Sequence, residues 1–243
     1  TQGDAIAAQR FVKRTGKKIE SRLELFCNGE PMQISRWPND GFTHIDKALG
    51  ETKFDVRGLP GRRDGIFSSV DDRPSRWTNE KDAMVRGYWF RDWVVQTQKI
   101  ESIDAEKRII KLAEPYHTYG GYRDGMWFFG FNMLCEVDMP GEWHLDREAG
   151  VLFFWPPTPL EDARVEVSVA DGLFRITNAA HITLRGLTLG VARGTAVRIK
   201  DSDTCGVIGC SIRNVTNQGA YGHFSRNRLP RLYWNSTEVT CRD

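Results

Sequence analysis

The chain has 243 residues, of which 40% are hydrophobic and 27% are charged, which is a composition typical of a globular protein with a core of its own. Its formal net charge is only +2, and Lys and Arg are mixed with Asp and Glu, so the concentrated basic face of a nucleic-acid-binding protein is not expected. No apolar run is long enough to cross a membrane, and no signal-peptide pattern is found. The composition therefore predicts no nucleic acid and no membrane as partners.

The N-terminal part of the chain predicts a short arm followed by paired strands. Residues 1–19 have a weak helical pattern and are interpreted as an N-terminal arm or linker. From residue 20 the hydrophobic period changes to two, and Asn28-Gly29 has the composition of a hairpin turn. Residues 46–82 are polar and rich in Gly, Pro and Arg, which predicts a long loop with one short strand near 65–70.

Further short apolar segments alternate with turn residues up to a hairpin that contains Trp143 and is closed by a Gly turn. Seven to nine short strands in this region favour a sandwich or a barrel, because these folds are built from short strands with frequent turns. We therefore expect residues 20–160 to form a β-sandwich-like domain.

The character of the sequence changes after Pro159. Short apolar segments of four to six residues recur at an offset of roughly 23 to 25 residues, so that Gly186 aligns with Gly209 and Leu189 with Ile212. No helical pattern separates them, and a helix-free repeat of this length predicts coils of a parallel β-helix over residues 161–243. The expected fold class is all-β, with a β-sandwich or barrel-like domain followed by a few coils of right-handed parallel β-helix.

A series of motifs also carries a family resemblance. They are Leu23–Met32, Arg36–Asn39, Gly87–Trp93, Pro140–Asp146, Phe154–Pro157 and Ala179–Leu189. In this order they resemble the bacterial right-handed parallel β-helix glycoside hydrolases that carry a β-sandwich insert, of the β-xylosidase and fucosidase/xylanase types. The resemblance implies a carbohydrate-active protein that acts on plant or bacterial polysaccharide and is secreted or periplasmic. It also implies a portion of a longer protein, because the family's catalytic carboxylates lie on later coils for which no matching motif is found here.

Two carboxylates are the candidates for catalysis within this chain. Hydrolysis of a glycosidic bond needs a pair of carboxyl groups across the scissile bond. Asp201 and Asp203 follow an apolar segment at 196–199, so we expect them at a corner of the β-helix, where two ordinary turn residues are the alternative interpretation. None of the cysteines has metal-ligand spacing and the histidines are scattered, so neither a metal nor another cofactor is expected.

Several other residues are candidates for binding a sugar. Tyr221 and His223 would share one face of a strand and could line a glycan groove. Trp77, Tyr119 and Tyr122 lie in segments that are expected to be exposed loops, where flat rings would suit the C–H face of a sugar. For each ring, a place in the core is the alternative.

Glu142 precedes Trp143 in the most family-like segment and could lie beside a ring that stacks on a sugar. Besides a glycoside hydrolase, the sequence is compatible with a non-catalytic glycan-binding module. It is also compatible with an assembly module that forms homo-oligomers through an exposed end of the β-helix, because unpaired strand edges invite pairing with another chain. A polysaccharide lyase with Arg193 or Arg198 as the base is a further alternative.

Overall fold

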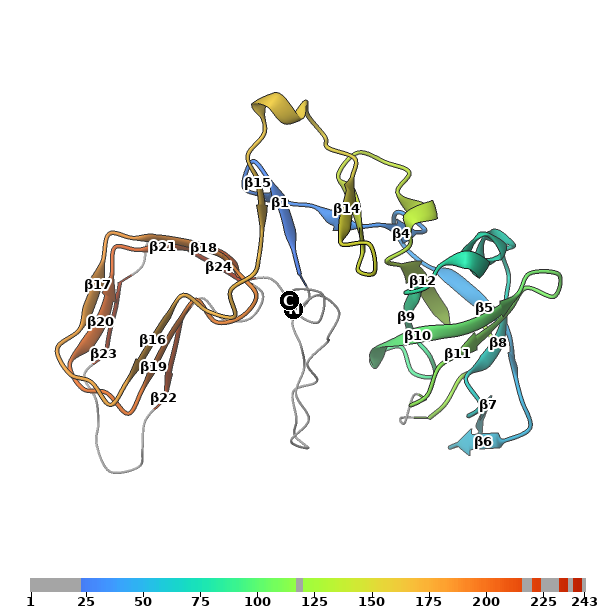
Figure 1. Cartoon of the computed structure of the whole chain (residues 1–243). Coiled ribbons are helices and arrows are strands. Elements are labelled where there is room, and N and C mark those ends of the chain that lie inside the picture. Colours follow the sequence, from blue (N-terminus) through green and yellow to red (C-terminus); the bar gives the residue numbers. More distant parts are fainter. Residues whose placement is uncertain (1–22, 117–119, 216–219, 224–231, 236–237, 242–243) are drawn as a thin grey trace. The chain divides into compact units, whose positions relative to one another are not determined.

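The computed structural model describes residues 23–116, 120–215, 220–223, 232–235 and 238–241, and divides the chain into two compact units. Residues 33–157 form the barrel unit, while residues 1–32 and 158–243 form the coil unit (Figure 1). The predicted N-terminal arm at 1–19 lies outside the described residues. The described part of the chain contains β-strands and short 3-10 turns, which confirms the all-β fold class. It contains no helix that is long and apolar enough to cross a membrane.

Six antiparallel strands close into a barrel in the barrel unit. In spatial order they are β12 (Trp127–Phe131), β5 (Thr43–Leu49), β8 (Ile66–Ser69), β11 (Ile109–Leu112), β10 (Val95–Asp104) and β9 (Met84–Tyr88). The ring closes because β12 pairs with β5 through its first residues and with β9 through Phe128 to Phe131, while β4 (Arg36–Trp37) also pairs with β12. Closure removes the free sheet edges that would otherwise invite pairing with other chains.

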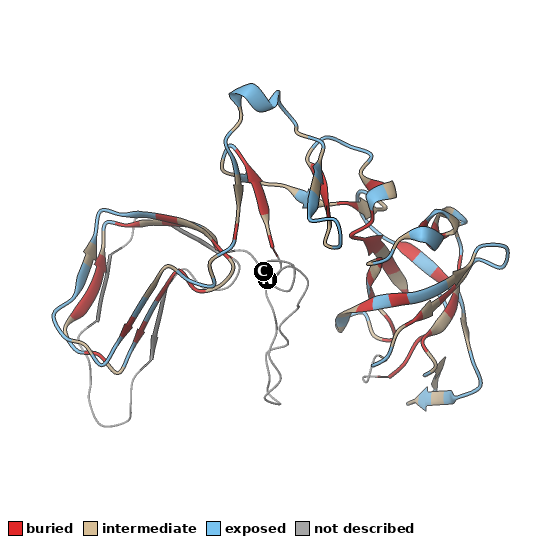
Figure 2. Ribbon diagram, in the orientation of Figure 1, coloured by how far each residue is buried: buried red, intermediate tan, exposed pale blue. Residues whose placement is uncertain are grey.

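Aromatic rings fill the barrel. Phe67 lies at the centre of a cluster in which its ring centroid is 5.8 Å from Trp89, 6.3 Å from Tyr122 and 5.1 Å from Phe128. All four rings are fully buried, and Figure 2 shows buried positions along the barrel strands. Each large ring removes much apolar surface from water, so this cluster is a main source of the unit's stability.

The expectation of one long loop over residues 46–82 is wrong. This segment continues β5 and then forms β6 (Lys53–Val56), β7 (Leu59–Arg62), β8 and the 3-10 turn η2 (Arg73–Asn79). The β6–β7 hairpin turns at Arg57 and Gly58, whose φ angles are 54° and 81°, as a two-residue turn requires. An Arg-Gly pair is a weaker turn signal than Asn-Gly, which explains why it was missed, whereas the expected short strand is confirmed as β8.

A small sheet completes the barrel unit. The predicted Trp143 hairpin is confirmed as β13 (Glu142–Asp146) and β14 (Val151–Phe154), with Gly150 at φ +68° in its turn. On its other side β13 pairs in parallel with β3 (Gln33–Ile34). The short turn η3 (Leu134–Glu136) precedes this sheet along the chain.

An antiparallel sheet opens the coil unit. Its order is β15 (Val165–Val167), β1 (Leu25–Cys27) and β2 (Glu30–Pro31), and the 3-10 turn η4 (Leu160–Asp162) precedes β15. The predicted hairpin at Asn28-Gly29 is confirmed, since both residues have positive φ. Asn214 of a later strand donates a 2.7 Å hydrogen bond from its Nδ2 to the carbonyl of Gly29, which joins this sheet to the coils.

The rest of the coil unit winds through three parallel sheets in turn (Figure 1). The first coil contributes β16 (Phe174–Thr177), β17 (Thr183–Arg185) and β18 (Thr188–Ala192). The second contributes β19 (Val197–Lys200), β20 (Cys205–Ile208) and β21 (Ser211–Val215). The third contributes β22 (Ala220–His223), β23 (Leu232–Asn235) and β24 (Glu238–Cys241). Each strand pairs with its equivalent in the next coil, which is the winding of a parallel β-helix, and no α-helix interrupts the described coils.

The predicted repeat fixes the register of these coils. Leu189 pairs with Ile212, as the alignment of the sequence predicts, and Gly186 and Gly209 both have positive φ at equivalent corners. Equivalent residues of the first and second coils therefore differ by 23 in number, as Phe174 and Val197 do, whereas Cys205 of the second coil pairs with Leu232 of the third, 27 residues later. Inward side chains of each coil bury themselves against those of the next, and the small thiols Cys205 and Cys210 lie in this core.

Candidate functional site

One sheet of the coil unit aligns the strands that carry several of the predicted site residues. The first sheet aligns β16, β19 and β22, so that Arg175 lies beside Arg198 and Arg198 beside Tyr221. Two residues further along, Thr177, Lys200 and His223 take equivalent positions. We name the outward side of this sheet, with Arg175, Thr177, Arg198 and Lys200 in its described strands, the β16–β19–β22 face.

The strand pattern explains why these side chains point outward. In β19 the apolar Val197 and Ile199 are buried, while the intervening Arg198 and Lys200 are exposed. The same alternation leaves Arg175 and Thr177 exposed in β16. Because strands of a parallel sheet lie about 4.8 Å apart, equivalent residues of successive coils form straight rows across the face.

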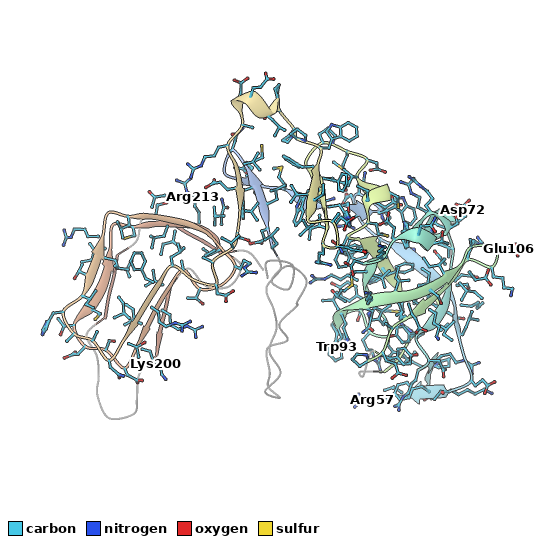
Figure 3. The ribbon with its side chains drawn as sticks, in the orientation of Figure 1. Arg57, Asp72, Trp93, Glu106, Lys200 and Arg213 are labelled. Atoms are coloured by element: carbon cyan, nitrogen blue, oxygen red, sulfur yellow. The ribbon has the colours of Figure 1, made fainter. Side chains whose placement is uncertain are left out.

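Positive charge gathers on this face. The six described coil strands β16 to β21 carry five basic residues and no acidic one: Arg175, Arg185, Arg198, Lys200 and Arg213. Three of the five lie on the β16–β19–β22 face, and Figure 3 shows Lys200 extending from it. The Lys200 ammonium lies 3.6 Å from the carboxylate of Asp201, which begins the following corner.

The two candidate carboxylates, Asp201 and Asp203, lie at that corner, as predicted. Asp201 turns the chain with φ 48°, and Asp203 is exposed. Between them Ser202 is buried, accepts a 3.2 Å hydrogen bond from the backbone N–H of Ala179, and donates one of 2.8 Å to the carbonyl of Lys200. The corner is therefore held by Ser202 and the backbone, and of the two carboxylates Asp201 lies next to a cation of the face.

Tyr221 and His223 lie in a strand, as expected, and take register positions beside Arg198 and Lys200. Their side chains lie outside the described part of the structure, so the shared outward face stays a prediction. Tyr119 lies outside the described residues altogether.

The expectation that Trp77 and Tyr122 lie in exposed loops is wrong. Their exposed fractions are 1% and 0%, and both belong to the core of the barrel unit. Tyr122 forms a bridge with Arg62, and the neighbouring Gly121 has φ +73° and packs so closely that a Cβ there would lie 2.2 Å from the Arg62 carbonyl oxygen. Because glycine has no Cβ, this segment can pack closely against the barrel, and the ring of Tyr122 is buried in the core instead of facing solvent.

The suggestion that Glu142 lies beside a sugar-binding ring is also wrong. Glu142 is fully buried, and Trp143 is only 2% exposed. The carboxylate accepts hydrogen bonds from the backbone N–H groups of Arg36 at 3.2 Å, Asp138 at 2.9 Å and Met139 at 3.3 Å. It therefore ties three segments of the barrel unit together and has a structural role.

The sequence analysis missed a second buried carboxylate, Glu136. The guanidinium of Arg73 donates to both of its oxygens at 2.6 to 3.1 Å, and the indole N–H of Trp77 donates to Oε1 at 2.7 Å. These bonds to Glu136 raise the pKa of Arg73. The sequence does hold a signal for this cluster. Glu136 stands within the apolar segment 128–137, which predicts that it is buried, and a buried charge needs a partner. All of these groups are engaged with one another, so the cluster stabilises the fold.

Two titratable groups of the barrel unit have pKa values that are shifted in the direction of the neutral form. Burial lowers the pKa of His144, whose Nδ1 has no hydrogen-bond partner among the described residues. Burial and the nearby carboxylates of Glu80 and Glu136 raise the pKa of the Cys135 thiol to about 12, which makes it a poor nucleophile. Within the described ranges, no three His, Cys, Asp or Glu residues gather as a metal site.

Comparison with known proteins gives one structural match. No protein-family model matches the chain, and neither does any curated protein. A solved structure titled "Glycoside hydrolase" superposes with a TM-score of 0.53 at 14% sequence identity. The superposition covers 88% of this chain and 50% of that structure, so the chain spans half the length of the protein it matches. At this identity the likeness concerns the fold.

Proposed function

We propose that this chain is a carbohydrate-active protein that binds an oligosaccharide or polysaccharide on the β16–β19–β22 face. The proposal is supported by the register of the sheet, which pairs Arg175 with Arg198 and Thr177 with Lys200, and by the carboxylate of Asp201 beside Lys200. The shared fold with a structure titled "Glycoside hydrolase" supports a carbohydrate as the ligand class.

The chemistry of the face suits an extended sugar chain. Arg198 and Lys200 present only hydrogen-bond donors, which match the hydroxyl and ring oxygens of a sugar. Asp201 and Asp203 present only acceptors when ionised, and these match sugar hydroxyl protons. A polymer with regularly spaced hydroxyls can meet equivalent groups in successive coils, because the rows repeat across the sheet.

Hydrolysis of the bound sugar is our second candidate function, and Asp201 and Asp203 are the carboxylates that we propose for it. They are favoured because both belong to the corner that directly follows β19, which is fixed by the buried Ser202. A glycoside hydrolase uses one carboxyl group as the acid and the other as the nucleophile or base. Glycoside turnover that is unaffected by changing both carboxylates would contradict this assignment.

Binding to the face is tested by removing its donors. We expect Arg198→Ala and Lys200→Ala each to weaken binding of a soluble polysaccharide by about tenfold, because a hydrogen bond to a charged group contributes about 1.5–3 kcal/mol. Isothermal titration against xylan, pectin and alginate measures this effect. The control is Arg213→Ala, which removes another exposed cation from a different coil sheet and should leave affinity unchanged. Equal losses in all three variants, or binding to none of the polymers, would contradict the proposal.

A further inference from the structure

We propose that the barrel unit has a binding site of its own, an outward strip of aromatic rings that takes an uncharged glycan. The strip crosses β5, β12 and β9, which follow one another around the barrel (Figure 1). We name it the aromatic strip, and it consists of Phe42 directly before β5, His44 of β5, Trp127 and Phe129 of β12, and Tyr88 of β9. It belongs to a different unit from the β16–β19–β22 face, so the two sites are tested separately.

The pairing of the barrel strands brings these rings together. Trp127 of β12 pairs with His44 of β5, and on its other side β12 pairs with β9, which ends at Tyr88. The ring centroid of Trp127 is 6.4 Å from that of His44 and 5.9 Å from that of Tyr88. Phe42 continues the series, at 5.9 Å from Tyr88 and 5.8 Å from Phe129. The five rings therefore form one continuous surface.

The alternation of the strands turns this surface away from the core. In β12, Phe128 is fully buried in the core of the barrel, whereas Trp127 and Phe129 on either side of it are half-buried. His44 is exposed between two buried residues of β5, and Phe42 is 42% exposed. Contiguous exposed rings of this kind mark a surface that binds something.

The polar edges of the strip have no hydrogen-bond partners among the residues that the structure describes. This holds for the indole N–H of Trp127, the hydroxyl of Tyr88 and the ring nitrogens of His44. The buried indoles of Trp77 and Trp89, by contrast, both donate hydrogen bonds, at 2.7 and 2.9 Å. A purely apolar partner would bury the polar edges of the strip unpaired, which is costly. The ligand must therefore bring polar atoms together with an apolar surface.

A sugar ring has this combination. The C–H groups of a pyranose form an apolar face that packs on an aromatic ring, and the hydroxyls around its rim both donate and accept hydrogen bonds. The charges beside the strip favour an uncharged sugar. Arg86 is exposed beside Phe129 in the register, but the guanidinium of Arg36 stacks on that ring at 3.9 Å and donates to the carbonyls of residues 38 and 41. These two cations are not the run of free positive charge with which proteins bind the phosphates of a nucleic acid.

Titration with neutral oligosaccharides measures binding to the strip. Isothermal titration uses xylohexaose, cellohexaose and mannohexaose with a full chain that carries Arg198→Ala and Lys200→Ala, which removes the donors of the β16–β19–β22 face. We expect at least one of the three to bind, and its affinity to stay constant as NaCl is raised, because salt does not screen an uncharged ligand. Binding of none of them would overturn the inference and leave the coil face to its own test.

Variants assign the binding to the strip. We expect Trp127→Ala to weaken it by about tenfold or more, because a large apolar contact is lost. Tyr88→Phe keeps the ring and its packing and removes only the hydroxyl, so a smaller loss is expected without a change in melting temperature. The control is Trp155→Ala, which removes a ring that is 47% exposed and lies outside the strip. It should leave affinity unchanged.

Four other outcomes would overturn the inference. Equal losses in Trp127→Ala and Trp155→Ala, or no loss in any variant, would exclude the strip as the site. Affinity that falls as NaCl is raised, or single-stranded DNA that displaces the oligosaccharide, would exclude an uncharged glycan as its ligand. A dimer in light scattering that Trp127→Ala dissociates would assign the strip to a second copy of the chain.

Discussion

Replacing Arg73 with Met is expected to destabilise the barrel unit by about 3–5 kcal/mol, because it leaves the buried charge of Glu136 without its cation. Glu136 is fully buried, and two nitrogens of Arg73 bind its two oxygens. After the substitution the indole N–H of Trp77, at 2.7 Å, and the thiol of Cys135, at 3.9 Å, would remain as neutral donors to Oε1. Urea unfolding followed by tryptophan fluorescence measures the change in the free energy of unfolding.

An exposed ion pair provides the matched control. Lys81 and Glu148 are also paired, but their side chains are 78% and 73% exposed, so Lys81→Met should lower the free energy of unfolding far less than Arg73→Met. The double variant with Arg73→Met and Glu136→Gln should recover part of the loss, since no unpaired charge is then buried. If Arg73→Met lowered the free energy of unfolding no more than Lys81→Met does, the Arg73–Glu136 pair would not stabilise the fold.

The second large effect concerns turnover of glycosides. For hydrolysis at the proposed corner, we expect Asp201→Asn and Asp203→Asn each to lower the turnover number for aryl glycosides by about 100-fold or more, as removal of a general acid or base does. Each variant keeps the shape of the side chain and removes only its ionisable group. Release of the aryl alcohol measures turnover for xylo-, fuco- and galacto-configured substrates.

Glu106→Gln is the control for this series, because Glu106 is an exposed carboxyl in the barrel unit (Figure 3). It should leave turnover unchanged. No turnover by the unaltered chain, or turnover that both Asp variants retain, would exclude hydrolysis at this corner while leaving the binding proposal to its own test.

Much of the coil unit was predictable because residues of the same type recur at equivalent positions along the sequence. The Gly186–Gly209 offset of 23 residues predicts which residues are neighbours in the first and second coils. The same offset applied to Arg175 leads to Arg198 and then to Tyr221, so the outer row was already contained in the sequence. Repeats are predictable in this way because each coil packs only on its neighbours.

The barrel unit was less predictable because its decisive contacts join residues far apart in the sequence. Tyr122 is buried by a bridge to Arg62, and Glu136 is paired with Arg73, and neither partner can be identified from local pattern. Aromatic and glycine-rich composition near Tyr122 fits an exposed loop and a close-packed one equally well. Closure of the barrel, which brings β9 and β12 together, decides between them.

Hydrogen–deuterium exchange of the chain with and without a bound oligosaccharide tests most directly where a sugar binds. Bound ligand slows exchange in the strands that it covers by opposing their local opening. We predict slower exchange in 174–177 and 197–203 and no change in the barrel strands β8 and β11. Slower exchange confined to the barrel unit, or none anywhere at saturating oligosaccharide, would contradict a glycan site on the β16–β19–β22 face.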